Sequence, residues 1–288
     1  MVTEPRARPA AGCGVATAPD PAEGPALSLV LPCYDEAARL PDTLAGYLAA
    51  LPRQPSEVEV LVVDDGSTDQ TVAVAHAAAA RDPRVRVVAG QPHRGKGFAV
   101  RTGVLAAAGQ LVVFTDADGA YGPAELGRVA AALADAQVAI GFRVLDTASG
   151  SLARRLASRQ FNQAVRALLG LPFGDTQCGL KGFRRHAARE LFGRARLDGF
   201  AFDAEVLFLA RRLGLRVAEV PVRAEQRGGS KVQLAVDAAR MLRDVVTVAR
   251  LAATGSYDLP SRQRPQAPAD GLAVGSALPV AGAGPPAT

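Results

Sequence analysis

The chain has 288 residues, a net charge of +5 and a pI near 9.5. This length suffices for one α/β domain with a hydrophobic core, and the basic charge favours an anionic partner. Tryptophan is absent and aromatic residues make up only 5% of the chain, so there are few side chains on which bases could stack, which argues against nucleic acid as that partner.

Cysteines and apolar runs bear on the cellular compartment. Cys13, Cys33 and Cys178 are odd in number and lack metal-ligand spacing, so neither a disulfide framework nor a zinc site is expected. No apolar run reaches the roughly 18 residues of a membrane span. The N-terminal stretch has prolines and acidic residues where a secretory signal needs an apolar segment. A cytoplasmic location is therefore the expectation.

Low-complexity stretches mark both ends of the chain. Residues 1–26 and 255–288 are rich in Pro, Ala and Gly and lack apolar periodicity, so neither can bury enough surface to offset its ordering entropy. We therefore expect disordered tails around one folded domain that spans residues 27–254.

The folded part begins with a strand and a polar loop. Residues 27–31 are apolar except for Ser28 and predict a strand that Pro32 stops. Pro41 fits the first position of the following helix. Tyr34 and Glu36 lie in the loop between them, at the end of a strand, where α/β sheets bind their ligands.

The second unit places two adjacent carboxylates at a strand end. Residues 58–63 predict a strand, and Asp64 and Asp65 follow it. Adjacent carboxylates repel each other unless a donor binds them, and a ribose hydroxyl or a base N–H would be such a donor. A turn at Asp65 is the alternative. Ser67 and Gln70 have the spacing of a capping box for the next helix.

The third unit ends in a basic loop that contains glycines. Residues 85–88 predict a strand, and the loop 91–97, which includes Lys96, leads into a helix predicted over residues 98–108. Backbone N–H groups between glycines at a helix N-terminus favour an anion, so this loop is a candidate phosphate site. His93 is expected to be a solvated loop residue.

The fourth unit carries an Asp-x-Asp pattern. Residues 111–114 predict a buried strand, which leads into Asp116 and Asp118, and Pro123 fits the start of another helix. Alternation along a strand would put the two carboxylates on the same side, where they could share Mg²⁺ or Mn²⁺ with a diphosphate. A simple turn at Asp118 is the alternative.

Four strand–loop–helix units in succession predict an α/β fold with a mostly parallel sheet and helices on both faces. Parallel strands end at the same edge, so Glu36, Asp64, Lys96 and Asp116 are expected to share the carboxyl edge of the sheet. This edge is the predicted functional site.

The second half of the chain combines basic and acidic residues around another polar loop. Residues 138–143 predict a short strand, and residues 152–169 predict a helix with a basic side. Asp175 lies in a polar, glycine-containing loop with no helix-capping role to explain it. Asp203 and Glu205 open a further helix, where complementing the helix dipole is their simplest role.

A strand over residues 217–222 and a helix over residues 232–253 complete the pattern. Arg240, Arg243 and Arg250 share one face of this C-terminal amphipathic helix. Another face carries an apolar stripe of Val232, Ala235, Ala239, Leu242, Val246 and Ala249. Such a helix can lie on an anionic membrane surface. Packing on its own domain is the alternative.

Together these stretches resemble the family 2 glycosyltransferases with a GT-A fold, specifically the polyprenyl-phosphate (dolichyl-phosphate) glucosyl- and mannosyltransferases. The ordered set covers roughly residues 27–254 and is more specific than any single piece. The matching segments are LPCYDEAARL from Leu31, VVDDGSTDQT from Val62, GKGFAVRTG from Gly95, FTDADGAYGP from Phe114, GFR from Gly141, DTQCGLKGF from Asp175, FAFDAE from Phe200, EVPV from Glu219 and GSKV from Gly229.

The resemblance implies a Rossmann-like GT-A fold, a nucleotide-sugar donor, Mg²⁺ or Mn²⁺, inversion at the anomeric carbon and a polyprenyl phosphate acceptor. Asp116 and Asp118 would hold the metal, and Lys96 would approach the donor phosphates. The residues implied to bind the nucleoside are Pro32, Tyr34, Glu36, Asp64 and Asp65. Those implied to meet the acceptor phosphate or the donor diphosphate are Arg143, Arg154, Arg155 and Lys231. We expect Asp175, Asp118 and Lys231 to be the catalytic residues.

Sequence details favour one branch of this family. The forms DADGA and DTQCGLK resemble the glucosyl branch more than the mannosyl branch, which favours UDP-glucose as the donor. Ala120 stands where the mannosyl branch can add a third metal ligand, and the tryptophan often found before GSK is missing. Membrane helices that some relatives carry are also missing, so any membrane contact would be peripheral, at the cytoplasmic face.

The expected activity is transfer of glucose from UDP-glucose to a polyprenyl phosphate. A phosphate monoester is already largely dianionic at neutral pH, so a strong general base is not obligatory. Asp175, Asp203 or Glu205 can then position the acceptor, orient an arginine or take a residual proton, and Asp175 ranks first because no helix-capping role explains it. The alternatives are transfer from GDP-mannose, transfer to a soluble sugar or glycan, and a non-enzymatic scaffold that binds nucleotide sugars. A nucleotidyltransferase is disfavoured because no glycine-rich basic loop follows the first strand.

Overall fold

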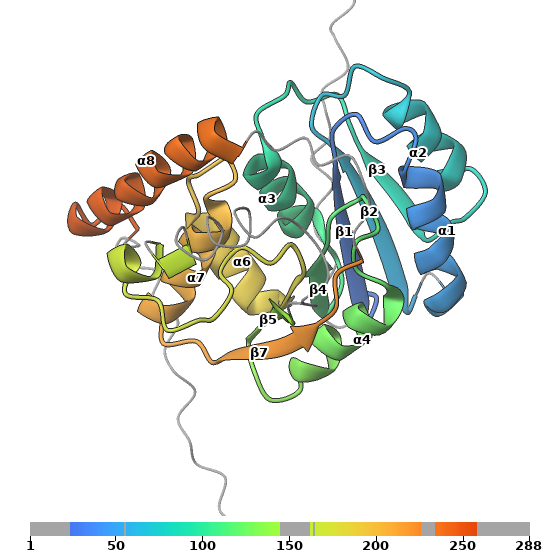
Figure 1. Cartoon of the computed structure of the whole chain (residues 1–288). Coiled ribbons are helices and arrows are strands. Elements are labelled where there is room, and N and C mark those ends of the chain that lie inside the picture. The colour runs from blue at the N-terminus through green and yellow to red at the C-terminus, as the bar shows by residue number, and fades with distance from the viewer. Residues whose placement is uncertain (1–23, 55, 145–161, 164, 226–233, 258–288) are drawn as a thin grey trace, which may run out of the picture.

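A seven-stranded β-sheet organises the chain (Figure 1). The structure is a computed structural model that describes residues 24–54, 56–144, 162–163, 165–225 and 234–257. The strands are β1 (Leu27–Cys33), β2 (Val58–Asp64), β3 (Val85–Val88), β4 (Leu111–Phe114), β5 (Val138–Arg143), β6 (Lys181–Arg184) and β7 (Val217–Val222). The helices are α1 (Leu40–Ala50), α2 (Thr71–Ala79), α3 (Lys96–Ala106), α4 (Pro123–Ala132), α6 (Arg185–Arg194), α7 (Phe202–Arg212) and α8 (Leu234–Ala253).

The sheet is mostly parallel, as predicted. Its strand order is β3-β2-β1-β4-β6-β5-β7. The pairs β1–β2, β2–β3, β1–β4 and β5–β7 are parallel, whereas β6 runs antiparallel to both of its neighbours, β4 and β5. The first residue of β6, Lys181, therefore lies level with Phe114, the last residue of β4.

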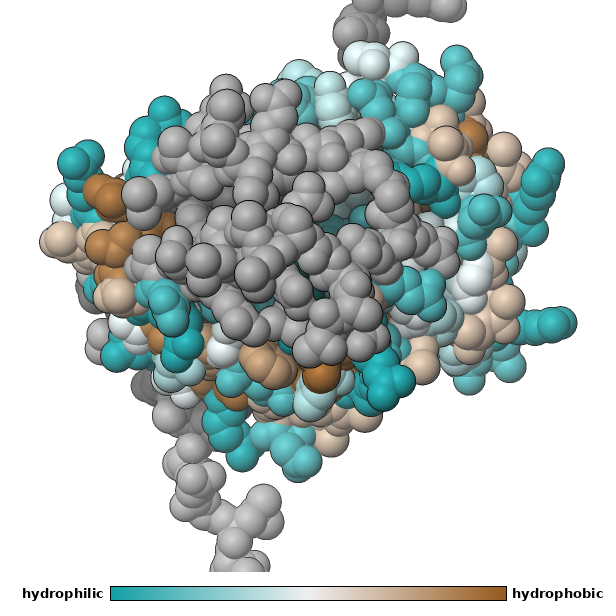
Figure 2. Space-filling view, viewed as in Figure 1, coloured by the Kyte–Doolittle hydropathy of each residue, from teal (hydrophilic) through white to brown (hydrophobic). Residues whose placement is uncertain are grey.

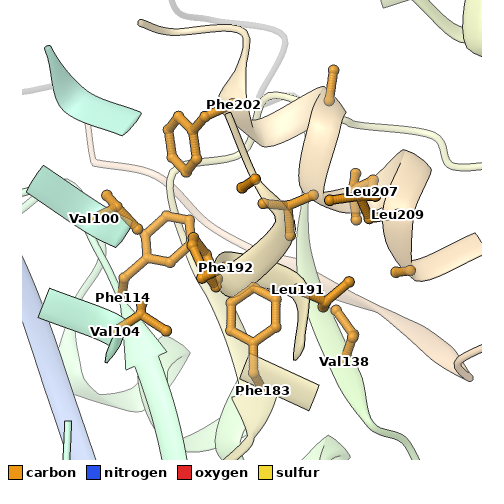
Figure 3. Close-up of a cluster of buried hydrophobic side chains, with 14 of the residues drawn as sticks. Val100, Val104, Phe114, Val138, Phe183, Leu191, Phe192, Phe202, Leu207 and Leu209 are labelled. Carbon is orange, nitrogen blue, oxygen red and sulfur yellow. The ribbon is translucent and has the colours of Figure 1, made fainter. Parts of the chain in front are cut away.

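Helices cover both faces of the sheet and enclose two hydrophobic clusters. One cluster packs α1, α2 and α4 against the sheet. The other packs α3, α6, α7 and part of α8 against the opposite face, and Figure 3 shows its aromatic centre. There Phe114 of β4 lies between Phe183 of β6 and Phe202 of α7, with ring centroids 6.1 Å and 5.7 Å apart. The predicted two-sided covering of the sheet is confirmed.

Pro32 does not stop the first strand. β1 continues to Cys33, and Pro32 pairs with Val63 of β2. The pairing of β1 with β4 ends at Val30, so Pro32 no longer lies between two strands that both need its missing N–H. The predicted stop at Pro32 was wrong for this reason.

The predicted capping box before the second helix is also wrong. α2 begins at Thr71, and Gln70 at its N-cap makes no side-chain capping bond. The Ser67 hydroxyl instead accepts a hydrogen bond from the backbone N–H of Asp35 at 2.9 Å. A contact between two strand-end loops has taken the place of the local cap.

The end of the chain packs further than the sequence predicted. Val245 and Val248 of α8 are buried in the core, whereas Ala249, placed by periodicity on the apolar stripe, is exposed. Tyr257, three residues past the expected domain end, is only 3% exposed. The side chains of residues 234–242, including Arg240, lie outside the described part. Of the predicted helix over residues 152–169, residues 162–163 and 165–169 are described and helical.

None of the helices in the described part of the chain combines the length and the apolar character that crossing a membrane requires.

Candidate functional site

Loops from four parallel strands meet at the carboxyl edge of the sheet. Asp64 closes β2, and its carboxylate accepts hydrogen bonds from the backbone N–H groups of Gly66 at 3.0 Å and Ser67 at 3.2 Å. These donors come from the chain itself and offset the repulsion expected between adjacent carboxylates. They also give Asp64 a turn-forming role that sequence reasoning did not find.

The neighbouring Asp65 organises the basic loop before α3. It is only 3% exposed, and its carboxylate accepts hydrogen bonds from the N–H groups of Arg94 at 3.0 Å and Gly95 at 2.8 Å. Nδ1 of His93 lies 2.9 Å from the same carboxylate, and the His93 ring stacks on Tyr34 with centroids 4.1 Å apart. His93 is an exposed loop residue, as predicted, and these contacts also tie it to the site.

The loop after β1 is fastened to the loop after β2. Asp35 has a positive φ of 51°, a conformation that aspartate tolerates better than most residues. Its carboxylate accepts a hydrogen bond from Thr68 N–H at 2.7 Å, and the Thr71 hydroxyl accepts one from Glu36 N–H at 2.7 Å. The Glu36 carboxylate also pairs with Arg39. The backbone on either side of Tyr34 is therefore held in place.

The glycines of the loop before α3 allow close packing against another segment of the chain. A Cβ on Gly95 would lie 2.6 Å from the carbonyl oxygen of Asp198, and one on Gly97 would lie 2.7 Å from that of Leu197. The N–H of Phe98 already donates to the Asp198 carbonyl at 3.1 Å. The 197–199 segment therefore packs against this helix N-terminus, and phosphate binding by the loop stays a prediction.

Lys96, in contrast, points to the Asp-x-Asp segment. Its ammonium lies 2.5 Å from Oδ1 of Asp116. Burial disfavours the charge on Lys96, but the carboxylates of Asp116, Asp203 and Asp118 outweigh that effect and raise its pKa. These three carboxylates make the sheet edge strongly negative, and the ammonium group of Lys96 is paired with one of them.

The Asp-x-Asp segment itself lies beyond the strand. β4 ends at Phe114, so the alternation argument for Asp116 and Asp118 was wrong, and a turn orients them instead. Oδ1 of Asp118 accepts a hydrogen bond from Ala120 N–H at 2.9 Å. The other Asp116 oxygen, Oδ2, lies so close to Gly179 that a Cβ there would overlap it.

The carboxylates of Asp116 and Asp118 could supply some of the ligands of a hard divalent cation. Both carboxylates are partly exposed at the sheet edge, and oxygen donors are what Mg²⁺ and Mn²⁺ prefer. Within the described ranges no group of three His, Cys, Asp or Glu residues could hold a metal. Phosphate oxygens and water would have to complete the coordination of such an ion.

On the other side of the edge, Asp175 holds Arg143. Oδ2 and Oδ1 of Asp175 accept hydrogen bonds from Nε of Arg143 at 2.7 Å and from Nη2 at 3.0 Å, a two-point pairing. Burial alone would raise the pKa of Asp175, but Arg143 outweighs burial and holds this pKa below its ordinary value. Asp175 is therefore suited to orienting an arginine and poorly suited to accepting a proton.

Asp203 and Glu205, the other two candidate acids, are both buried, and each has partners that the sequence did not reveal. Lys181 is fully buried, and its ammonium lies 2.5 Å from Oδ1 of Asp203. Glu205, also fully buried, accepts hydrogen bonds from the N–H groups of Arg196 and Leu197 at 2.8 Å and 2.9 Å. Both acids thus do more than complement a helix dipole. The sequence does contain a pattern that could have drawn attention to Lys181, namely a lysine at the start of a strand that contains glycine.

Three ion pairs therefore lie around this edge of the sheet: Arg143–Asp175, Lys181–Asp203 and Lys96–Asp116. Such an arrangement can bind a polyanion next to a metal ion and stabilise negative charge that develops on it. Arg154, Arg155 and Lys231, which the sequence also assigned to anion binding, lie outside the described residues.

Solved structures show where this fold occurs. The chain is similar to glucosyl-3-phosphoglycerate synthase from Mycobacterium tuberculosis, crystallised with Mn²⁺, UDP and glucosyl-3-phosphoglycerate, with a TM-score of 0.59, 23% identity and coverage of 82% of each chain. The complex of that enzyme with phosphoglyceric acid gives a TM-score of 0.60, 23% identity and coverage of 79% of this chain and 81% of that chain. These likenesses confirm the predicted GT-A fold.

Curated relatives are closer in sequence. The chain is 39% identical over 224 residues to dolichyl-phosphate beta-glucosyltransferase of Drosophila melanogaster, covering 72% of this chain and 69% of the fly protein. It is 32% identical over 251 residues to the Homo sapiens protein of the same name, covering 81% of this chain and 78% of the human one. The model of the family described as Glycosyl transferase family 2 matches residues 28–192, more than half of the chain. The chain therefore belongs to this family of glycosyltransferases, as its motifs predicted.

Proposed function

We propose that this glycosyltransferase moves glucose from UDP-glucose to a polyprenyl phosphate, with inversion at the anomeric carbon. The observation that carries the proposal is the name shared by its relatives in animals and yeast, dolichyl-phosphate beta-glucosyltransferase, over 69–78% of their lengths. The ion pairs at the sheet edge support it, because donor and acceptor each bring phosphate groups that need cationic partners.

Asp116 and Asp118 are the proposed residues for Mg²⁺ or Mn²⁺. When bound, the metal would neutralise charge on the departing nucleoside diphosphate. Lys96 is the proposed partner of the same phosphates, because its ammonium is already held at Asp116. The relative with this fold from Mycobacterium tuberculosis was crystallised with Mn²⁺ and UDP, which is consistent with this choice of metal and nucleotide.

The nucleoside would bind beside the loops after β1 and β2. Tyr34 offers an aromatic surface there, next to Asp64 and Asp65. The backbone of both loops is held by the hydrogen bonds of Asp35 and Glu36. Pro32, inside β1, contributes by shaping the start of this loop. We propose that this preorganised surface selects the base and ribose.

Arg143 is the proposed binding residue for the acceptor phosphate, with Arg154, Arg155 and Lys231 as further cations. Asp175 is the proposed positioning residue that holds the Arg143 guanidinium in one orientation. The acceptor phosphate is already mostly dianionic near neutral pH, since its second pKa is about 6. It can therefore attack the anomeric carbon as the bond to the diphosphate breaks, without giving a proton to Asp175.

An assay with two extractable phases tests this proposal. Purified full-length chain is incubated with radiolabelled UDP-glucose, a short polyprenyl phosphate and Mg²⁺ or Mn²⁺, and the label in the chloroform phase is measured. Label in that phase, lost on chelation of the metal, is the expected result. A parallel reaction with labelled GDP-mannose tests the mannosyl alternative, and a clear preference for it overturns the glucosyl assignment.

The same assay tests the soluble-acceptor alternative. Addition of phosphoglyceric acid, the compound bound in one solved structure of the same fold, or of a sugar acceptor would place label in a water-soluble product. Label confined to the aqueous phase overturns the lipid acceptor. Binding of UDP-glucose without any product would favour the scaffold alternative.

We further propose peripheral contact with an anionic membrane through α8. Val245 and Val248 pack inward, while Arg243, Ala249 and Arg250 are exposed. Figure 2 shows hydrophobic surface at the left of this face, in the region where Figure 1 places one end of α8. Co-sedimentation with vesicles that contain phosphatidylserine, but not with neutral vesicles, is expected. If the chain sediments with neither kind of vesicle, the proposed contact at the cytoplasmic face is contradicted.

A further inference from the structure

Lys181 is a fully buried cation at the first position of β6. Its ammonium donates to Oδ1 of Asp203 at 2.5 Å and to the main-chain carbonyl of Cys178 at 2.5 Å. The ring of Phe114 lies 5.7 Å from the same nitrogen. β6 brings this charge to the carboxyl edge because it runs against β4 and β5.

A buried ion pair is weak evidence of a stabilising role. Removing two charges from water costs free energy, and apolar residues of similar volume often stabilise a core as well or better. The composition also singles out this residue. Lys96, Lys181 and Lys231 are the three lysines of the chain, and its other 30 basic residues, 33 less three, are arginines. All three lie in segments assigned to the site.

The contacts of Lys181 lead directly to the Asp-x-Asp segment. The carbonyl that it binds belongs to Cys178, and the next residue, Gly179, packs against Oδ2 of Asp116. The turn that begins with Asp175 continues into these two residues. One ammonium group therefore fixes a backbone segment that touches Asp116 at one end and carries the partner of Arg143 at the other.

We propose that Lys181, held by Asp203, is a positioning residue that fixes the turn 175–179 and thereby the carboxylate of Asp116 for binding of the metal and the donor diphosphate. Asp203 is the counter-ion of Lys181 in this arrangement. The inference rests on the proposed function for the metal role of Asp116. It assigns to the Lys181–Asp203 pair a task that its burial alone does not explain.

Mn²⁺ binding in the presence of UDP tests the inference without any transfer reaction. The loss of the free Mn²⁺ signal in electron paramagnetic resonance gives the dissociation constant, and thermal unfolding gives Tm. Asp203→Asn keeps the shape of the side chain and is expected to weaken Mn²⁺ binding about 10-fold or more, the range found for residues that orient metal ligands. Glu59→Gln is the matched control.

Glu59 is also a buried carboxylate, bonded to Ser28 and paired with Arg86 near the amino end of β2. Its substitution should lower Tm as Asp203→Asn does, with Mn²⁺ binding unchanged. A second comparison replaces the pair by apolar residues. Lys181→Met combined with Asp203→Leu should recover much of the Tm that either single change loses, while Mn²⁺ binding stays weak.

Two results would overturn the inference. One is wild-type Mn²⁺ affinity in Asp203→Asn, and the other is recovery of Mn²⁺ affinity together with Tm in the double variant, because either assigns the pair a structural role only. A wild-type chain that binds Mn²⁺ and UDP but transfers no glucose contradicts the proposed function alone. A wild-type chain that binds no Mn²⁺ contradicts both.

Discussion

Gly179 leaves no room for a side chain beside Asp116, because a Cβ at residue 179 would overlap Oδ2 of that aspartate. Glycine is needed at residue 179 because the Asp116 side chain approaches its Cα closely. The backbone conformation does not require glycine, since φ of Gly179 is not in the left-handed region. The contact joins the loop after β4 to the turn before β6, which are far apart in sequence. An added side chain at residue 179 would displace the Asp116 carboxylate from this position.

Gly179→Ala should therefore lower glycosyl transfer on the order of 10²-fold, because a small displacement of a group that positions the reactants has effects of that size. Steady-state rates at saturating metal measure the change. Gly127→Ala is the control, since a Cβ at this exposed position in α4 meets no atom within 4 Å. That control should stabilise the chain by about 0.5–1 kcal/mol. Wild-type activity in Gly179→Ala would contradict the close packing.

Neutralising either aspartate of the Asp-x-Asp segment tests the metal assignment. Asp116→Asn and Asp118→Asn should each lower kcat/KM on the order of 10²-fold or more, because charge stabilisation at the leaving group would be lost. Asp42→Asn on the exposed side of α1 is the control and should have no effect. Unchanged turnover in the two site variants, or activity that survives metal chelation, would show that another group binds the donor phosphates.

The pairing of Asp175 with Arg143 predicts a particular pH profile. Because Arg143 holds the pKa of Asp175 below its ordinary value of 3.8, Asp175 stays ionised throughout the neutral range. The acid limb of kcat/KM should then follow the acceptor phosphate, with a pKa near 6. Asp175→Asn should lower the rate and leave that limb in place. Loss of the limb in Asp175→Asn would identify Asp175 as the proton acceptor.

The same pair makes a separate contribution to stability. A carboxyl whose pKa is depressed on folding stabilises the native state above its unfolded pKa, and the contribution is lost as the pH falls through the folded value. The difference in free energy of unfolding between wild type and Arg143→Gln should thus be greatest above pH 3.8 and shrink in more acidic solution. Urea unfolding at several pH values measures it. A difference that grows on acidification would contradict the depressed pKa.

Tyr257 fastens the end of α8 to the core. Its hydroxyl donates to the buried carboxylate of Glu205 at 2.7 Å. Tyr257→Phe removes one hydrogen bond to a charged group and should cost about 1.5–3 kcal/mol of stability, read from urea unfolding. Ser256→Ala, at the exposed neighbouring position, should change stability little. Equal stability of the two variants would show that the hydrogen bond contributes nothing net.

The strands could be predicted from sequence because most are short apolar runs, which fit only the buried interior of a sheet. The bounds of β3, β5 and β7 agree with prediction, and β2 is buried along its whole length. The shared edge of Glu36, Asp64, Lys96 and Asp116 also followed, since parallel strands end together. Local patterns were enough for these features.

The contacts between loops could not be predicted in the same way. Lys181 meets Asp203 across 22 residues and Gly95 meets Asp198 across 103, and no local pattern encodes such pairs. The glycines before α3 had two uses, anion binding and close packing, that look alike in sequence. The structure reveals the close packing because it shows what lies against each glycine.

The reversal of β6 also sets the order in which the sheet can be completed. β5 hydrogen-bonds only to β6 and β7 in the described sheet, and β6 is the strand that joins it to β4. During synthesis from the N-terminus, β1 to β4 can pair early, but β5 has no neighbour until the chain has passed Arg184. Non-local pairing of this kind slows folding and leaves strand edges open. A nascent chain halted between β5 and β6 should therefore be the species most prone to aggregate.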